Sequence, residues 1–295
     1  MIIQDLVKDK AIMTPKWLPD NTHYLTVMGS EAYGVSNRGS DIDVYGFCIP
    51  PKGVVFPHTV GVIKGFGDQG EVFDQWQQHH INYKEKEYDF QVFSIVKYFQ
   101  LCMDNNPNAL DSLFTYRTCV IHSTDIAEHV RNNRRLFLHK GSYHKFRGYA
   151  YSQLSKIKNK TNSSNPKRAA DIIENGYDTK FAYHVVRLAL QAQQILLVGD
   201  MDIMANREML KTIRAGEWSL ERLTSWFDEQ EKVLENLYAS STLRHVPDEV
   251  SIKQVLVQCL EMHYGSLDFN VSKNIHQESL LTDLQNLVTK YRYGG

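Results

Sequence analysis

The stretch MGSEAYGVSNRGSDIDVYGF, residues 28–47, places a Gly-Ser pair about ten residues ahead of two aspartates that are separated by one residue. The segments HYLTVMGS before the loop and DIDVYGFCI after it predict two short strands, the second with clear alternation of apolar and polar residues. Side chains at i and i+2 of a strand project to one face, so Asp41 and Asp43 are expected to lie side by side. Two such carboxylates repel each other unless a cation lies between them.

A hard divalent cation would relieve this repulsion. Mg²⁺ prefers oxygen ligands and leaves coordination positions for substrate phosphates, and two such ions can stabilise the attacking and leaving oxygens of a phosphoryl or nucleotidyl transfer. Gly29 and Ser30 would present backbone amides and a hydroxyl to the phosphates, because glycine lets the backbone approach closely. A lone D-x-D pair also occurs on solvated loop edges. The Gly-Ser turn and the flanking strands favour the functional interpretation here.

Composition limits the classes of protein to consider. The chain has 295 residues, of which 42% are hydrophobic and 23% charged, as in globular proteins with one or two domains. A run of about 18 apolar residues and a secretory signal are both missing from the sequence, so no membrane association is expected. The four cysteines are far apart, which disfavours a zinc site or a disulfide scaffold and predicts a cytoplasmic protein. His79 and His80, adjacent in an extended segment, are expected to point oppositely and not to share a metal.

The pattern along the chain predicts a mixed α/β unit over residues 1–120 and an all-helical unit over residues 121–295. Residues 52–80 are rich in glycine and predict an irregular segment. A strand is expected over 87–95, followed directly by a helix, and Asn106-Pro107-Asn108 separates that helix from the next. Later helices are predicted over residues 141–160, 180–198, 219–241 and 247–263.

The C-terminal unit begins with a strongly basic segment. Residues 131–168 contain eleven lysines and arginines and no acidic residue, which leaves 22 basic against 34 acidic residues in the rest of the chain. Aromatic residues alternate with these cations, a combination that single-stranded or structured RNA can use. Two alternatives remain: the aromatics belong to the core, or the cations bind only an incoming nucleotide.

Three basic residues share one ridge of the helix predicted over 180–198. Lys180, His184 and Arg187 stand at i, i+4 and i+7, within about 60° of one another at roughly 100° per residue. Such groups repel each other unless an anion meets them, and a nucleoside triphosphate opposite the acidic site would supply it. The alternative is a solvated face with a neutral histidine. Asp178 is also suited to cap the helix.

These motifs together resemble the DNA polymerase β-type nucleotidyltransferase superfamily, and more closely the YcgL-like predicted nucleotidyltransferases, an RNA-repair-associated polymerase β-like family. The resemblance extends over about residues 24–200 and is carried by GSEAYGVSNRGSDIDVYG, YDFQVFSIVKYFQLCMDNNPNALDSLF and GYDTKFAYHVVRLALQAQQILLVGD. It implies an α+β fold. A polymerase β-like domain, with a mixed sheet flanked by helices, would precede an all-helical domain.

The resemblance also implies a third acidic metal ligand on a neighbouring strand. Asp89 fits that position best, and Glu87, two residues earlier, is the rival candidate. With Asp41 and Asp43, Asp89 would bind two Mg²⁺ ions, for which Mn²⁺ could substitute. The residues implied in nucleotide binding are Gly29, Ser30, Ser40, Lys180, His184 and Arg187.

The expected reaction is transfer of a nucleoside monophosphate from an NTP to a hydroxyl group, with release of pyrophosphate. The favoured acceptor is the 3′ end of an RNA, a tRNA or another. The alternatives are nucleotidylation of a protein or small molecule by the same chemistry, and a non-catalytic nucleic-acid-binding module that retains the fold. Because one fold can host all of these functions, fold alone does not decide between them.

Overall fold

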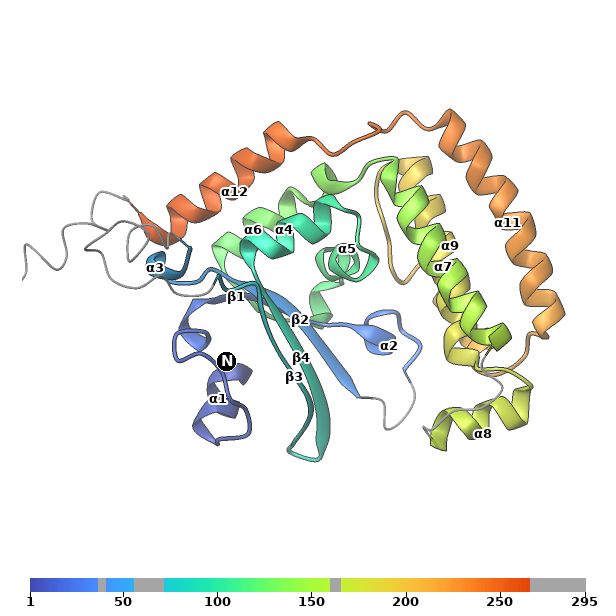
Figure 1. Ribbon diagram of the computed structural model, residues 1–295, viewed down its shortest axis with the longest axis horizontal. Coiled ribbons are helices and arrows are strands. Elements are labelled where there is room, and N and C mark those ends of the chain that lie inside the picture. Colours follow the sequence, from blue (N-terminus) through green and yellow to red (C-terminus); the bar gives the residue numbers. More distant parts are fainter. Residues whose placement is uncertain (37–40, 56–71, 160–165, 266–295) are drawn as a thin grey trace, which may run out of the picture.

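The computed structural model describes residues 1–36, 41–55, 72–159 and 166–265 (Figure 1). A five-stranded mixed sheet has the strand order β3-β4-β2-β1-β5. β2 and β4 are parallel, and the other neighbours are antiparallel. The strands are β1 (Thr22–Val27), β2 (Ile42–Cys48), β3 (Gln75–Tyr83), β4 (Lys86–Ser94) and β5 (Val120–Ser123).

The two central strands follow the predicted pattern closely. In β2, the buried Val44 pairs with Phe90 of β4 on one face, whereas Phe47 pairs with Phe93 on the other. Gly46 allows β1 to approach, because a Cβ there would lie 1.8 Å from the carbonyl oxygen of Tyr24. β2 ends just before Pro50 and Pro51, as expected for residues that cannot donate to a ladder.

Helices cover both faces of the sheet and continue into the C-terminal part. Several begin at side-chain caps: Asn106 accepts hydrogen bonds from the amides of Asn108 and Ala109, with Pro107 at the first helical position. The helices are α1 (Ile2–Lys8), α2 (Gly29–Ala32), α3 (Lys52–Val55), α4 (Ile95–Met103), α5 (Pro107–Phe114), α6 (Asp125–Asn132), α7 (Gly141–Asn159), α8 (Pro166–Asn175), α9 (Thr179–Val198), α10 (Arg207–Arg214), α11 (Leu220–Ser240) and α12 (Glu249–Tyr264).

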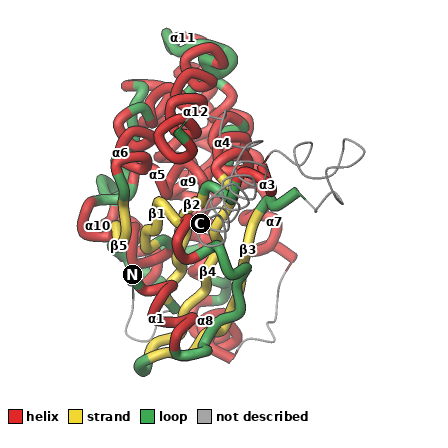
Figure 2. The backbone as a smooth tube through the Cα atoms, turned by 90° about the vertical axis from the view of Figure 1, so that its left-hand side faces the viewer, coloured by secondary structure: helices red, strands yellow, loops and turns green. Residues whose placement is uncertain are grey.

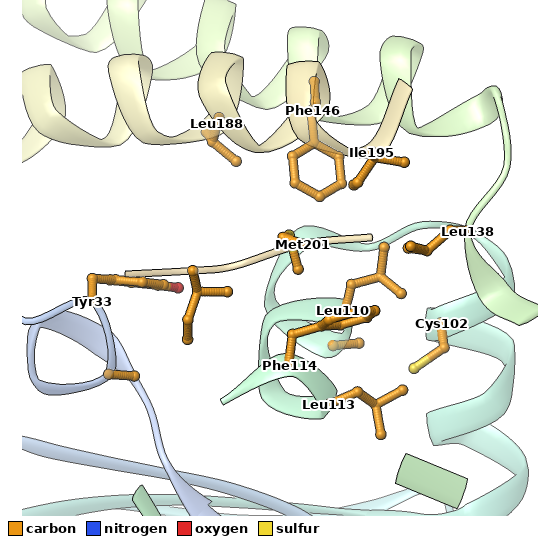
Figure 3. Packing of buried hydrophobic residues seen from close by; sticks show 14 of the residues in the cluster. Tyr33, Cys102, Leu110, Leu113, Phe114, Leu138, Phe146, Leu188, Ile195 and Met201 are labelled. Carbon is orange, nitrogen blue, oxygen red and sulfur yellow. The ribbon is translucent and has the colours of Figure 1, made fainter. Parts of the chain in front are cut away.

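One continuous hydrophobic core joins the sheet to the C-terminal helices. Figure 3 shows Phe146 of α7 and Leu188 and Ile195 of α9 packing toward the side chains of α5. α9 lies at the centre of the helical part and is buried along most of its length. On the opposite face of the sheet, α1 covers a second, smaller cluster that includes Leu25 and Val44. The predicted α+β architecture, a mixed sheet flanked by helices and followed by further helices, is confirmed.

Two details differ from the sequence-based predictions. Residues 75–80, expected to be irregular, belong to β3, an edge strand whose polar side chains hide its strand character. The sheet also extends beyond the predicted domain boundary at residue 120, because β5 pairs with β1.

At the end of the described chain, α12 returns to the sheet, where His263 Nδ1 lies 3.0 Å from Nε2 of His23 on β1. Figure 2 shows most helices gathered above and beside the strands, with α1 and α8 at the lower end.

None of the described helices combines the length and the apolar character needed to cross a membrane.

Candidate active site

A cavity of about 760 Å³ lies between the sheet and the helices α8, α9 and α10. Its wall on the sheet side carries the carboxylates of Asp41, Asp43 and Asp89, together with Gly29 and Ser30. The opposite wall carries basic side chains, which are described below. Residues from eight separate elements thus meet in one space.

The acidic wall is set by the register of two parallel strands. Asp43 of β2 and Asp89 of β4 are direct neighbours across the ladder, and Asp41 immediately precedes β2. Glu87, the rival of Asp89, does not line the cavity; its carboxylate lies 2.6 Å from Nδ1 of His80. The structure therefore brings the three predicted aspartates together and leaves Glu87 outside.

Asp43 is a mostly buried carboxylate with two acidic neighbours, and its pKa is raised. Burial raises the pKa of Asp43, and the negative charges of Asp89 and Asp41 raise it further, whereas Lys180 across the cavity opposes them. Asp43 is therefore a carboxylate whose charge is not fully compensated by the protein, as expected at a site that receives a cation.

A β-bulge in β3 brings two histidines next to the acidic wall. The register shifts between Gln78 and Ile81, and His80 has a φ of 56°. The amide of His80 donates to Asp89 at 2.8 Å, and Nδ1 of His79 lies 3.4 Å from the other oxygen of the same carboxylate. Both histidines consequently face carboxylates of β4, which strict strand alternation does not predict.

The Gly-Ser turn lies directly against Asp43. Gly29 has a φ of 66°, and a Cβ at this position would lie 2.2 Å from Oδ2 of Asp43. The amide of Met28 donates to the carbonyl oxygen of Asp43 at 2.7 Å, which fixes the turn to β2. Glycine is required here both for its backbone conformation and for the close approach.

Replacing Gly29 by Ala is expected to reduce activity strongly, because the added methyl group must displace the carboxylate of Asp43. The left-handed conformation alone costs about 1–2 kcal/mol for an alanine. Gly176 offers a matched control, since its φ is 79° and no atom lies within 4 Å of a Cβ placed there. Gly29→Ala and Gly176→Ala should lower the melting temperature similarly. Equal activity of the two variants, measured as initial rates, would contradict a role for the close approach.

The opposite wall of the cavity carries basic side chains together with the carboxylates of Asp171, Glu174 and Asp178, and Asp178 lies 3.7 Å from Arg168. Lys180 and His184 come from α9, Arg168 from α8 and Arg214 from α10. Partial desolvation lowers the pKa of Lys180, and the charge of Arg168 lowers it further. Burial, followed by the charges of Arg187 and Lys180, lowers the pKa of His184 well below its usual value, so this histidine is neutral. Lys180, Arg168 and Arg214 supply the positive charge.

Arg214 was not predicted from the sequence. It stands at the end of a short amphipathic helix, and no local pattern links it to Lys180. Its Nε is buried and has no hydrogen-bond partner among the described residues, while its guanidinium lies 5.3 Å from the ring centroid of Tyr183. A buried donor of this kind is suited to an anionic ligand.

Arg187 does not line the cavity, in contrast to the position expected for a phosphate contact. Its side chain is 4% exposed and forms an ion pair with the buried Asp111 of α5. The guanidinium also lies 4.2 Å from the ring centroid of Tyr33, whose hydroxyl donates to Asp111 at 2.7 Å. This network connects the end of α2 with α5 and α9. Arg187 therefore stabilises the helices that form the cavity wall without lining the cavity itself.

Ser40 lies outside the residues that the structure describes. Asp178 caps α9, because its Oδ1 accepts a hydrogen bond from the amide of Lys180 at 2.9 Å, and it also forms part of the cavity lining. Its capping role agrees with the prediction from the sequence.

The donor set of the acidic wall fits a hard cation such as Mg²⁺. Within the described part of the chain, no three His, Cys, Asp or Glu side chains are arranged to hold a metal by themselves. Mg²⁺ does not require such a cage, since one or two carboxylates and the substrate phosphates usually suffice. Asp43 and Asp89 are paired in register and carry oxygen donors, and burial raises the pKa of Asp43. These two residues, with Asp41 beside them, are therefore the candidates to hold the ion.

The basic segment over residues 131–168 is partly neutralised by the fold. Arg131 is buried against Tyr24 and Thr115, Arg135 pairs with Asp200, and Arg147 pairs with Glu231. Among its aromatics, Phe137, Tyr143 and Phe146 belong to the core, whereas Tyr149 and Tyr151 are exposed. The core alternative thus holds for three of the five aromatic residues.

Comparison with known proteins identifies the family of this chain. A model of the RNA repair pathway DNA polymerase beta family matches residues 8–245, which confirms the resemblance seen in the sequence. Among solved structures, the chain is similar to a nucleotidyltransferase-like protein from Exiguobacterium sibiricum 255-15, with 10% identity, a TM-score of 0.29, and coverage of 99% of this chain and 90% of that one. Functionally curated proteins yield no significant match. The chain belongs to the RNA repair pathway DNA polymerase beta family, a family of nucleotidyltransferases.

Proposed function

We propose that this protein transfers a nucleoside monophosphate from an NTP to the 3′-hydroxyl of an RNA, and that it does so with Mg²⁺. The observation that carries the proposal is that carboxylates on one wall of the cavity face basic side chains on the other. Asp43 and Asp89 lie in register on the sheet side, and Lys180, Arg168 and Arg214 lie opposite. A triphosphate bound with a divalent cation matches this distribution of charge, because the cation meets the carboxylates and the phosphate oxygens meet the basic side chains.

The proposed reaction follows from the positions of these groups. The acceptor hydroxyl oxygen forms a bond to the α-phosphorus, the bond between that phosphorus and the β-phosphate oxygen breaks, and pyrophosphate leaves with the electron pair. The hydroxyl proton passes to a carboxylate of the acidic wall, which acts as the general base. Lys180 and Arg214 stabilise the charge that develops on the pyrophosphate. When bound, Mg²⁺ would neutralise the triphosphate and the leaving group.

The choice of RNA as acceptor rests on the family, whose description places it in RNA repair. We also propose a cytoplasmic location, which agrees with four free cysteines, as is usual in reducing compartments. The competing acceptors, a protein side chain or a small molecule, use the same chemistry and are outcomes of the test.

The test is incubation of the protein with Mg²⁺, each α-³²P-labelled NTP in turn and total RNA. The label is then followed into RNA, protein and small molecules, with Asp43→Asn as the inactive control. Label that enters RNA with an intact 3′-hydroxyl, and not RNA with a blocked 3′ end, supports the proposal and identifies the nucleotide. Label found in protein or in a small molecule overturns the choice of acceptor, and no label in any fraction overturns the transfer reaction.

Substitution of Lys180 by Gln is expected to reduce kcat/KM for the NTP by on the order of 10²-fold, because one charge aimed at the pyrophosphate is removed. The matched control is Lys232→Gln, a change of the same kind on the exposed face of α11. Initial rates over a range of NTP concentrations provide the comparison. Equal rates for both variants would contradict a role of Lys180 in binding phosphate.

A further inference from the structure

One face of α7 carries an exposed stripe that the reaction described above does not use. Lys145, Tyr149, Ser152 and Lys156 are spaced by four, three and four residues, and all four are exposed. At about 100° per residue they fall within roughly 60° of one another. We name these four residues the α7 track. The other faces of the helix are occupied: Phe146 is buried in the core, and Arg147, on the opposite side from the track, pairs with Glu231 of α11.

The α7 track runs beside the cavity. Nζ of Lys156 lies 5.5 Å from the ring centroid of Phe181, and the same ring lies 5.0 Å from the guanidinium of Arg168, which lines the cavity. Toward the other end, Tyr149 is close enough to influence the ionisation of Tyr45, another lining residue. In Figure 1, α7 lies between α11 and the part of the molecule that holds the sheet. The face turned away from α11 is therefore turned toward the active site.

The chemistry of the track fits a single polynucleotide strand. Its lysines form no ion pair with the described acidic residues, and α7 itself contains no Asp or Glu. Tyr149 is 40% exposed and offers a ring on which a base can stack. Next to it, Gly148 has no atom within 4 Å of a Cβ placed there, so a strand can approach the helix closely. Lys145 and Lys156 are eleven residues apart, or about 16 Å along the helix axis, and thus span several nucleotides.

We propose that the α7 track binds the 3′-terminal nucleotides of a single-stranded RNA acceptor and leads its end into the cavity. This inference rests on the proposed function. Lys145 and Lys156 contact phosphates, and Tyr149 stacks on a base between them. A protein partner, which needs a larger apolar surface than one tyrosine supplies, is the less favoured occupant.

The test uses two lysines of the same helix that point in opposite directions. Lys156 belongs to the track, and Lys158, also exposed, lies about 160° away from it around the helix axis. Binding of a 3′-hydroxyl single-stranded oligoribonucleotide of about twelve nucleotides is measured by fluorescence anisotropy at several salt concentrations. Lys156→Glu is expected to weaken binding about tenfold, whereas Lys158→Glu should leave it nearly unchanged. Tyr149→Ala should also weaken binding about tenfold, with the salt dependence unaltered.

The double variant Lys145→Glu/Lys156→Glu gives a second readout. Loss of two phosphate contacts should reduce the slope of log K against log salt by about 1.4. Equal effects of Lys156→Glu and Lys158→Glu, or an unchanged slope of log K against log salt in the double variant, would contradict RNA binding by the α7 track. Because binding is measured without NTP, it is independent of transfer. Wild-type protein that binds RNA through the track but labels only protein would overturn the proposed acceptor and leave the binding surface intact.

Discussion

Asp43→Asn is expected to reduce nucleotidyl transfer by on the order of 10²–10³-fold, the usual effect of removing one group that stabilises developing charge. It should nevertheless leave the protein at least as stable as the wild type. Burial and the neighbouring Asp89 raise the pKa of Asp43, so the folded state binds its proton more tightly than the unfolded state does. Ionised Asp43 therefore lowers stability, and the loss develops as the pH rises through its folded pKa. Asparagine removes this cost.

The measurement combines initial rates with thermal unfolding in metal-free buffer at acidic and neutral pH. At neutral pH the variant should melt at the same temperature as the wild type or higher, and the difference should vanish below the unfolded pKa of aspartate. Asp228→Asn, on the exposed face of α11, is the control for the loss of one negative charge. A large drop in melting temperature together with the loss of activity would instead indicate a structural role for Asp43.

Disruption of the buried network behind the cavity is expected to have the largest effect on stability. Asp111→Asn or Arg187→Gln each leaves one buried charge without its partner, because Asp111 is fully buried and Arg187 is 4% exposed. Such a loss typically destabilises by about 3–5 kcal/mol. Since Tyr33 and Gln191 also bond to Asp111, α2 should shift as well, and Gly29 and Ser30 with it.

The double variant Asp111→Asn/Arg187→Gln distinguishes an ion pair from two independent contributions. Its cost in urea unfolding should be well below the sum of the two single costs, since neither charge is then left alone. If the single costs simply add, the two residues do not act as a pair. For activity, a bracing role predicts that Arg187→Gln lowers kcat with little change in the apparent KM for the NTP. A rise in KM with no change in kcat would instead indicate that Arg187 contacts a phosphate, as the sequence first suggested.

The sequence allowed the fold class and half of the acidic wall to be predicted, because these depend on local periodicity. Alternation alone places Asp41 and Asp43 on one face of a strand. The pairing of Asp43 with Asp89 depends on the register between two strands that are distant in the chain, and here only the family resemblance identified Asp89. β3 was missed because it is an edge strand with polar residues at most positions, so it lacks the apolar alternation on which such a prediction depends.

Helix α9 shows that residue spacing predicts which side chains share a face but not what each of them contacts. Spacing correctly indicates that Lys180, His184 and Arg187 share a ridge, but it cannot show what each turn of that ridge meets. Lys180 faces the cavity, whereas Arg187, two turns later, meets a carboxylate 76 residues away in the chain. Arg214 was missed for the opposite reason. It lines the same cavity from α10, but the sequence around it contains no pattern that indicates a functional site.

The most direct test of the central claim is a crystal structure of the protein with Mg²⁺ and an ATP analogue that cannot be hydrolysed between its α- and β-phosphates. We predict that the ion is bound by Asp43 and Asp89, and that the triphosphate extends from it toward Lys180 and Arg214. A triphosphate bound elsewhere, or an ion that avoids both aspartates, would contradict the assignment of this cavity as the active site.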